Sequence, residues 1–177
     1  VLRAEARFTG RAELQAGPHR IVARRIVLAT GSRPAVPAIP GLADVPYLTN
    51  ETLFANRALP DHLVVIGGGP VGLEMAQAHR RLGARVTVLE AGRVLARDDR
   101  ELADVVVRRL VREGIDLREQ ARIARVERAA LGTTVVLEDG TRLDASHLLV
   151  ATGRTPTIDG LALDIAGIAL TARGITV

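Results

Sequence analysis

Residues Leu63 to Glu74 read LVVIGGGPVGLE, and this stretch decides how the chain around it folds. Its opening apolar run is typical of a buried parallel strand. Gly67, Gly69 and Gly72 follow that run in G-x-G-x-x-G spacing, and good helix formers extend from Pro70 to Leu82. The pattern therefore predicts a strand, a tight glycine turn and a helix.

The three glycines have separate physical roles in such a turn. Gly67 permits the tight bend, Gly69 lets a pyrophosphate approach the main chain, and Gly72 lets the helix pack close to the strand. The first turn of the helix also presents free N–H groups and a partial positive charge to phosphates. We interpret the segment as a dinucleotide-binding turn. A glycine-rich turn without a ligand is the alternative.

A second strand and an acidic residue follow where a dinucleotide site needs them. Gly83 ends the helix, and Arg85 to Leu89 reads as a strand. Glu90 comes next, 18 residues beyond Gly72. A carboxylate at this point accepts hydrogen bonds from the hydroxyls of an adenosine ribose. The alternative role for Glu90 is to cap the end of the strand.

The composition limits the class of protein. The chain has 177 residues, of which 47% are apolar, and this suffices for one good core or two small ones. No apolar run approaches the ~18 residues of a transmembrane helix, and no signal peptide is visible. We therefore expect a cytoplasmic protein with no membrane partner.

Cysteine, histidine and charge exclude or disfavour further classes. The chain has no cysteine, which excludes a disulfide or a thiolate metal site within it. Its four histidines are far apart in sequence, so we expect no metal site. The net charge of +4 is carried by scattered arginines, and only 2% of the residues are aromatic, which leaves little surface for stacking bases. We expect no nucleic-acid partner.

An internal repeat divides the chain. ATGSRP at residues 29–34 returns as ATGRTP at residues 151–156, a separation of 122 residues that also aligns Gly10 with Gly132. Each copy closes a stretch that reads as a β-meander. In the first copy we expect the run that ends at Thr30 to be a buried strand.

Residues 61–118 read as a complete βαβαβ unit. Asp98 stands three residues before Glu101, as in a capping box, and predicts the start of a second helix. The apolar face of that helix is expected to contain Leu102, Val105, Val106 and Leu110. Ile115 to Leu117 is expected to be the third strand. Before this unit, the proline-rich residues 33–46 predict a semi-rigid crossover.

A dinucleotide unit precedes the second meander, but none precedes the first. Because the chain thus contains the ends of two similar domains, we expect the missing unit to lie before Val1. The sequence would then be a fragment, with one whole nucleotide domain and the tail of another.

Three motifs carry a resemblance that covers essentially the whole chain. The glycine segment, ATGSRPAVPAIPG at 29–41 and ATGRTPT at 151–157 resemble segments of the FAD-dependent pyridine nucleotide-disulfide oxidoreductases. That family includes dihydrolipoamide dehydrogenase, glutathione reductase and mercuric reductase. The resemblance implies an α/β fold, in which a Rossmann-like βαβαβ NAD(P)-binding domain carries an inserted antiparallel β-meander. Partial FAD-domain segments at 1–46 and 153–177 would flank an NAD(P) domain at 47–152.

The resemblance also implies roles for individual residues. The NAD pyrophosphate would lie against Gly67, Gly68, Gly69, Pro70, Val71 and Gly72. Glu74 would face the nicotinamide side, Glu90 the adenosine ribose, Ile123 the adenine and Gly153 the nicotinamide half. Thr30, Gly31 and Ser32 would touch FAD in the intact parent. Each of these residues also has a purely structural alternative, such as a core position for Ile123.

The implied activity is hydride transfer from NADH to FAD and on to a disulfide or similar acceptor. The partners would be NADH and the FAD and dimerisation domains of the parent, which is expected to be a homodimer. We name no catalytic residue, because the family's cysteine pair would precede Val1 and its acid–base pair would follow Val177. Thr157 departs from the family, which usually has Asn there.

Three alternatives stay open. An NADH oxidase or a ferredoxin reductase would carry the same NAD domain. A stand-alone nucleotide-binding module would not need a flavin partner, but it would not be expected to carry half of a second domain. NADP is less favoured than NAD because Glu90 would repel a 2′-phosphate, although Arg93 lies close enough in sequence to bind one.

Overall fold

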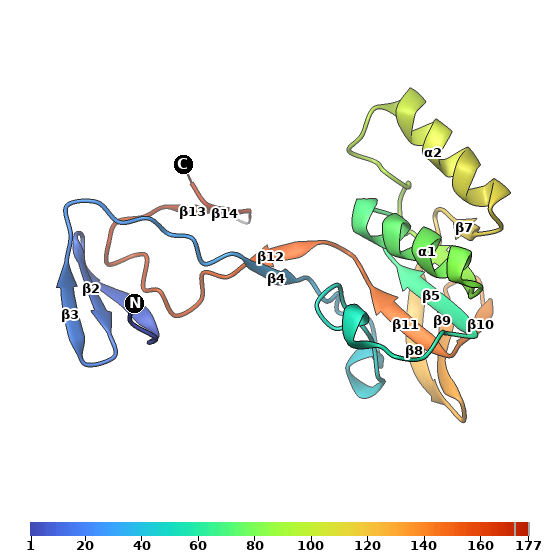
Figure 1. Ribbon diagram of the computed structural model, residues 1–177, viewed down its shortest axis with the longest axis horizontal. Helices are drawn as coiled ribbons and strands as arrows, with labels where there is room; N and C mark the ends of the chain where they lie inside the picture. The colour runs from blue at the N-terminus through green and yellow to red at the C-terminus, as the bar shows by residue number, and fades with distance from the viewer. Residues whose placement is uncertain (172, 177) are drawn as a thin grey trace. The chain divides into compact units, whose positions relative to one another are not determined.

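The computed structural model of the chain describes residues 1–171 and 173–176 (Figure 1). Two compact units form and are described separately. The central unit is Pro34–Gly153, and the terminal unit combines Val1–Arg33 with the described residues from Arg154 onward. The central unit therefore begins earlier than the 47–152 range proposed for the nucleotide domain.

A parallel sheet forms the middle layer of the central unit. Its strand order is β11-β5-β6-β7, and each neighbouring pair is parallel. The strands are β5 (His62–Ile66), β6 (Arg85–Leu89), β7 (Asp116–Arg118) and β11 (His147–Val150). The runs of Val, Leu and Ile suit strands that are covered on both faces. This order confirms the predicted βαβαβ arrangement.

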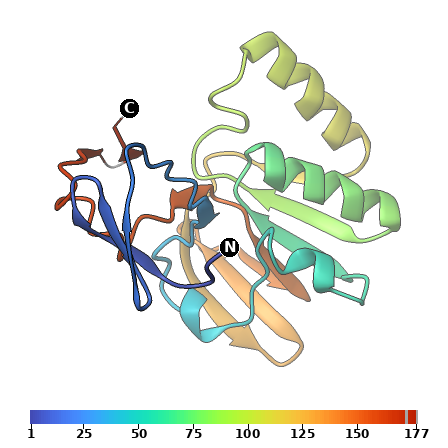
Figure 2. The same ribbon diagram turned by 60° about the vertical axis from the view of Figure 1, so that its left-hand side comes forward.

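Helices cover one face of this sheet and an antiparallel meander covers the other (Figure 2). Successive side chains of β5 separate into two cores, as the alternation of a strand requires. Leu63 and Val65 pack with Leu73 of α1 (Pro70–Leu82). Val64 and Ile66 pack with the meander. The meander strands are β8 (Ile123–Ala129), β9 (Gly132–Leu137) and β10 (Arg142–Ala145). The predicted α/β fold with an inserted antiparallel meander is confirmed.

The turn at Asp139 and Gly140 joins β9 to β10. Gly140 has a φ of 85°, and the side chain of Asp139 accepts a 2.8 Å hydrogen bond from the backbone N–H of Thr141. The stretch after this turn forms two separate strands. Ser146 lies between β10 and β11, and its backbone N–H donates to His62 O at 3.0 Å. β11 then pairs with β5 in the parallel sheet.

The second helix, α2 (Arg100–Arg112), differs from expectation in two respects. Its N-cap is Asp99 rather than Asp98, since the Asp99 side chain accepts from the N–H groups of Glu101 and Leu102 at 3.0 and 3.2 Å. Its buried side chains are Ala103 and Leu110, whereas Leu102 is 68% exposed. The expected apolar face was wrong for three residues, namely Leu102, Val105 and Val106, which lie outside the contact with the sheet.

The proline-rich segment belongs to the central unit. It contains the short 3-10 turn η1 (Leu42–Asp44), and Leu42 and Val45 are buried in the core beneath the meander. A second 3-10 turn, η2 (Leu53–Ala55), follows. The segment 34–46 is therefore partly core rather than a bare crossover.

The terminal unit contains the first meander. Strands β1 (Ala6–Gly10), β2 (Glu13–Ala16) and β3 (His19–Val22) form an antiparallel sheet in chain order. Phe8, Leu163 and Ala166 form its small core, so residues from both ends of the chain pack together. The remaining strands are β4 (Ser32–Pro34), which pairs with β12 (Arg154–Pro156), and β13 (Leu170–Thr171), which pairs with β14 (Gly174–Ile175).

The expected buried strand ending at Thr30 is not present. The chain leaves the sheet after Val22, and Val27 is 88% exposed. The second copy of the same motif is the buried strand β11, because β5 pairs with it. Within the described residues no strand pairs with residues 26–30, so this run has no ladder to join.

Candidate functional site

The glycine turn lies at the carboxyl edge of the parallel sheet. Gly67 follows β5 with a φ of 113°, and its N–H donates to Leu89 O of β6 at 2.9 Å. Gly69 is the N-cap of α1, and Pro70 occupies the first helical position. Helix α1 therefore starts at the edge where parallel sheets bind ligands, with its N–H groups turned toward that edge.

Two glycines of the turn are needed by the fold itself. A β-carbon on Gly67 would stand 2.5 Å from the backbone oxygen of Ala151, and one on Gly72 would stand 2.2 Å from the oxygen of Gly67. Either contact is a clash with main chain. The predicted roles of Gly67 in the bend and Gly72 in close helix packing agree with this geometry.

Gly69 differs, because no packing within the chain requires it. A β-carbon there would meet nothing within 4 Å, and its φ of −79° suits any residue. The absent side chain therefore leaves open space beside the free N–H groups of α1. This is the position where a pyrophosphate would approach the backbone. The cradle fits a dinucleotide.

Glu90 joins the end of β6 to the glycine turn. Its carboxylate accepts from the N–H of Gly68 at 2.7 Å and from the N–H of Gly92 at 2.8 Å. A β-carbon on Gly68 would come within 2.8 Å of Val94 and 3.0 Å of Glu90, so this glycine makes room for the same loop. The turn and the acidic residue predicted from separate motifs are thus in direct contact.

The other predicted residues occupy more varied places. Gly153 follows β11 with a φ of 127°, and a β-carbon on it would meet nothing within 4 Å. Glu74 is exposed on α1, and Val71 is 44% exposed near its start. Ile123 is half-buried against the core beneath the meander and pairs with Leu137. Its core role is therefore visible, and its adenine role stays a prediction.

Thr30, Gly31 and Ser32 lie in the terminal unit, apart in the chain from the glycine turn. Gly31 has a φ of 70°, and Thr30 is exposed. The hydroxyl of Ser32 accepts a 2.7 Å hydrogen bond from Arg154 Nε. This segment is held by the second copy of its own motif, and its contact with FAD stays a prediction.

The charges near Glu90 bear on the choice of nucleotide. Arg93, the candidate for a 2′-phosphate, lies 3.9 Å from Asp104 on α2. The sequence did not reveal this pairing, because it joins a loop to a helix face. Arg100 is closer to the same carboxylate, at 3.2 Å, so the contact of Arg93 with Asp104 is a weak surface contact.

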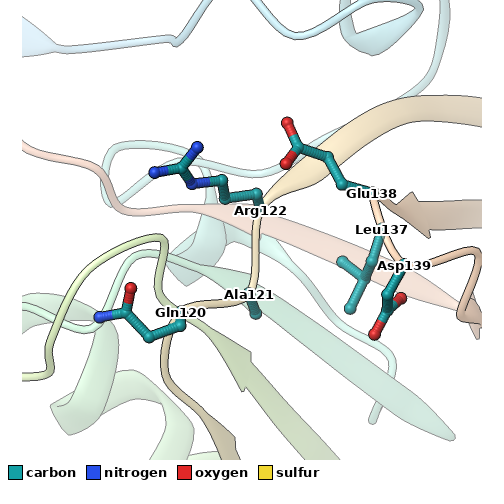
Figure 3. A pocket seen from close by; sticks show the side chains of 6 residues that line it. All are labelled: Gln120, Ala121, Arg122, Leu137, Glu138 and Asp139. Atoms are coloured by element: carbon teal, nitrogen blue, oxygen red, sulfur yellow. The ribbon is translucent and has the colours of Figure 1, made fainter.

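A shallow pocket of about 220 Å³ lies close to this loop, where the chain passes from β7 to β8 (Figure 3). It is lined by Gln120, Ala121, Arg122, Leu137, Glu138 and Asp139. Gln120 stands at one end, and Leu137 and Asp139 stand at the other. Sequence reasoning had not identified Gln120, since nothing local marks its contacts.

A buried polar group lies at the opposite, amino edge of the sheet. His62, at the start of β5, contacts Asp144 O through Nδ1 at 2.6 Å and Thr87 Oγ1 through Nε2 at 2.9 Å. Burial lowers the pKa of His62. Its position away from the glycine turn indicates a structural role.

Metal sites and membrane spans are missing from the part of the chain that the structure describes. Across 1–171 and 173–176, no cluster of three or more His, Cys, Asp or Glu side chains could hold a metal ion. No helix in the same residues is long and apolar enough to cross a membrane.

Sequence comparison relates the chain to known oxidoreductases. The profile of the pyridine nucleotide-disulphide oxidoreductases matches residues 1–177. The mercuric reductases of Shigella flexneri and Acidithiobacillus ferrooxidans are each 40% identical to it over 98% of its length. The chain spans 32% of each of these relatives, or about a third.

Solved structures extend the similarity to the fold. The Cu(II) complex of the HOCl-induced flavoprotein disulfide reductase RclA from Escherichia coli is 33% identical, with a TM-score of 0.90. The match covers 98% of this chain and 40% of that one. The ferredoxin reductase for the CYP199A2 system from Rhodopseudomonas palustris is 30% identical, with a TM-score of 0.85 and coverages of 99% and 45%.

Proposed function

Because this chain belongs to the pyridine nucleotide-disulphide oxidoreductase family, whose members depend on FAD and NAD(P), we propose that its central unit binds NAD(H). In the parent protein the nucleotide would supply a hydride to FAD, and the electrons would pass to a disulfide or similar acceptor. The terminal unit would belong to the FAD domain of that parent, a homodimer.

One observation carries the proposal: Gly69 is open where the fold does not need a glycine, and Glu90 lies against the same turn. The free N–H groups at the start of α1 would bind the pyrophosphate, and the Glu90 carboxylate would accept from the ribose hydroxyls. Glu74, Ile123 and Gly153 would line the rest of the nucleotide. The chain's own part is binding and orientation, since the cofactors carry the redox chemistry.

NAD is favoured over NADP by the charge at the ribose position. The Glu90 carboxylate would repel a 2′-phosphate. The acceptor is less constrained, because the similar proteins include mercuric reductases, a flavoprotein disulfide reductase and a ferredoxin reductase. A ferredoxin reductase or an NADH oxidase therefore remains the second candidate for the parent.

The direct test is to titrate the 177-residue chain with NADH and with NADPH and to follow its thermal unfolding. A ligand that binds only the folded state stabilises it, by about 2.7 kcal/mol at a hundred times its Kd. We expect stabilisation by NADH and much less by NADPH. The reverse order would overturn the assignment of Glu90.

A matched pair of variants locates the site. Gly69→Ala adds a methyl group to open space at the proposed pyrophosphate position, so it should abolish the NADH effect while the chain stays folded. Gly10→Ala, where the nearest contact would be an ordinary 3.5 Å, is the control in the terminal unit. Equal NADH binding by both variants would place the nucleotide elsewhere.

The class of the parent can be read from its coding sequence. A second glycine motif upstream, followed by C-x-x-x-x-C, would support a disulfide reductase. A glycine motif without the cysteine pair would support an oxidase or ferredoxin reductase. The absence of both motifs upstream would favour a stand-alone module.

A further inference from the structure

The loop Glu90–Leu95 begins with the carboxylate that we propose to bind the ribose. On one side, this loop is hydrogen-bonded to the glycine turn. The Glu90 carboxylate accepts from Gly68 N–H at 2.7 Å, and Leu95 N–H donates to Gly68 O at 3.0 Å. Leu95 has a left-handed φ of 51°, which few leucines adopt, so the loop end is held in a specific conformation.

The same loop is fastened on its other side by two residues after β7. Glu119 Oε1 accepts from the N–H of Val94 at 2.8 Å. Gln120 donates twice to the carbonyl oxygen of Gly92, through its backbone N–H and its side-chain Nε2, each at 3.0 Å. Gln120 also has a left-handed φ, 54°, and this conformation turns its N–H groups toward the loop.

These contacts occupy both backbone polar groups of Gly92 and the buried N–H of Val94. Gly92 donates its N–H to the Glu90 carboxylate at 2.8 Å, while its oxygen receives the two bonds from Gln120. Val94 is only 1% exposed, so without Glu119 its N–H would lose its partner in a site that water does not reach freely. Loss of either side chain would therefore remove one of the hydrogen bonds that hold the loop next to Glu90.

We propose that Glu119 and Gln120 are positioning residues that fix the Glu90 carboxylate for the ribose of the nucleotide and so set the preference for NADH over NADPH. The inference rests on the proposed function. Neither residue needs to touch the nucleotide, because each acts through the Glu90–Leu95 loop.

Four variants separate positioning from general stability. Glu119→Ala removes the acceptor for Val94 N–H, whereas Glu119→Gln keeps an oxygen there and should restore wild-type behaviour. Gln120→Gly keeps the left-handed backbone and its N–H bond but removes the side-chain bond. Glu138→Ala removes a nearby exposed carboxylate of the same pocket, which controls for net charge (Figure 3).

The first readout is the pair of dissociation constants for NADH and NADPH, with thermal unfolding measured alongside. Glu119→Ala and Gln120→Gly should weaken NADH about fivefold to tenfold, the equivalent of about one hydrogen bond, while NADPH binding changes less. An unchanged ratio of the two constants would overturn the inference, even if the melting temperature falls.

The second readout needs no nucleotide. Amide hydrogen exchange of Gly68 and Gly92 should accelerate in Glu119→Ala and return to the wild-type rate in Glu119→Gln. If the wild-type chain binds no nucleotide, only the proposed function is overturned. The exchange rates would still report whether Glu119 positions the loop. Unchanged exchange in Glu119→Ala would overturn the positioning role itself.

Discussion

The backbone N–H of Ala35 donates to the carbonyl oxygen of Gly153 at 2.9 Å, and the internal repeat supplies the counterpart of this bond. Replacing each residue by its equivalent in the other copy, 122 positions away, gives Thr157 and Gly31, and Thr157 N–H donates to Gly31 O at 3.0 Å. The first bond lies within the central unit and the second within the terminal unit. The two copies of the motif therefore make equivalent backbone bonds to each other.

The side chains of the paired motifs should be energetically coupled. Arg154 Nε donates to the Ser32 hydroxyl at 2.7 Å, and the same guanidinium also bonds to Ser32 O. In a double-mutant cycle of Ser32→Ala and Arg154→Ala, we expect a coupling of about 0.5 to 1 kcal/mol in the free energy of urea unfolding. Additive losses would mean that the pair contributes only through the backbone.

Substitutions in the glycine turn should separate folding from binding. Gly72→Ala would place a β-carbon 2.2 Å from a backbone oxygen, so it should lower the free energy of unfolding by about 2 to 3 kcal/mol. Gly69→Ala should cost about 1 kcal/mol or less, as an N-cap change without a clash. Urea unfolding of the two variants checks the order, and equal losses would contradict the assignment of Gly69 to the ligand.

The elements that sequence predicted well are those set by neighbours along the chain. The strand, turn, helix and second strand around Gly67 depend on local runs and spacings, and family membership followed from these motifs and is confirmed. The prediction was wrong where a partner distant in sequence determines whether a strand forms. The run ending at Thr30 has the composition of β11 but lacks the strand that pairs with β11.

Side-chain contacts across the site were equally beyond local patterns. Glu119 and Gln120 read as ordinary polar residues after a strand, and only the folded loop brings them to Val94 and Gly92. Likewise, a helical wheel placed Leu102 on the buried face of α2, because the wheel does not show how much of a helix face the sheet can cover.

His62 should make the stability of the central unit depend on pH near neutrality. Burial lowers its pKa, so the folded chain binds a proton on this imidazole only at lower pH than the unfolded chain, where histidine titrates at about pH 6.5. The free energy of unfolding should therefore fall as the pH drops from 7 to 5, by at most about 1.4 kcal/mol per pH unit. The groups that face the ring are Asp144 O, Arg85, Thr87, Asp116 and Arg118.

Urea unfolding of His62→Gln at the two pH values checks this prediction. The variant loses the titrating group, so its pH slope should be smaller than that of the wild type. His19→Gln, at an exposed histidine of β3, serves as the control and should keep the wild-type slope. A slope that is unchanged in His62→Gln would assign the pH dependence to other groups.

Glu113 should stabilise the junction of the two helices down to acid pH. Its carboxylate accepts two bonds from Arg81, at 2.9 and 2.8 Å, and one from Arg109 at 2.5 Å. Hydrogen bonds from Arg81 and then Arg109 lower the pKa of Glu113 from 4.5 to about 2. Its contribution is thus present above about pH 4.5 and is lost as the pH falls toward 2.

Melting temperatures of wild type and Glu113→Gln at pH 7 and pH 2 test this contribution. We expect Glu113→Gln to melt lower at pH 7, because an amide cannot accept the bidentate arginine contact as a carboxylate does. The difference should shrink at pH 2, close to the folded-state pKa, where about half of the wild-type carboxyl groups are protonated. A constant difference at both pH values would attribute the effect to packing.

Glu90 variants should distinguish the ribose contact from the support that the same carboxylate gives to the loop. Glu90→Ala removes both, so NADH binding should weaken by about tenfold or more while NADPH binding weakens less, since the repulsion of a 2′-phosphate also disappears. Glu90→Gln has one oxygen for the two N–H groups of Gly68 and Gly92, so one of them loses its acceptor. We therefore expect Glu90→Gln to lower the free energy of unfolding by about 1 kcal/mol and to weaken NADH binding. The variant also lacks the negative charge that would repel the 2′-phosphate of NADPH. Calorimetric titration with both nucleotides decides the matter: equal weakening of NADH and NADPH by Glu90→Ala would mean that this carboxylate does not read the ribose.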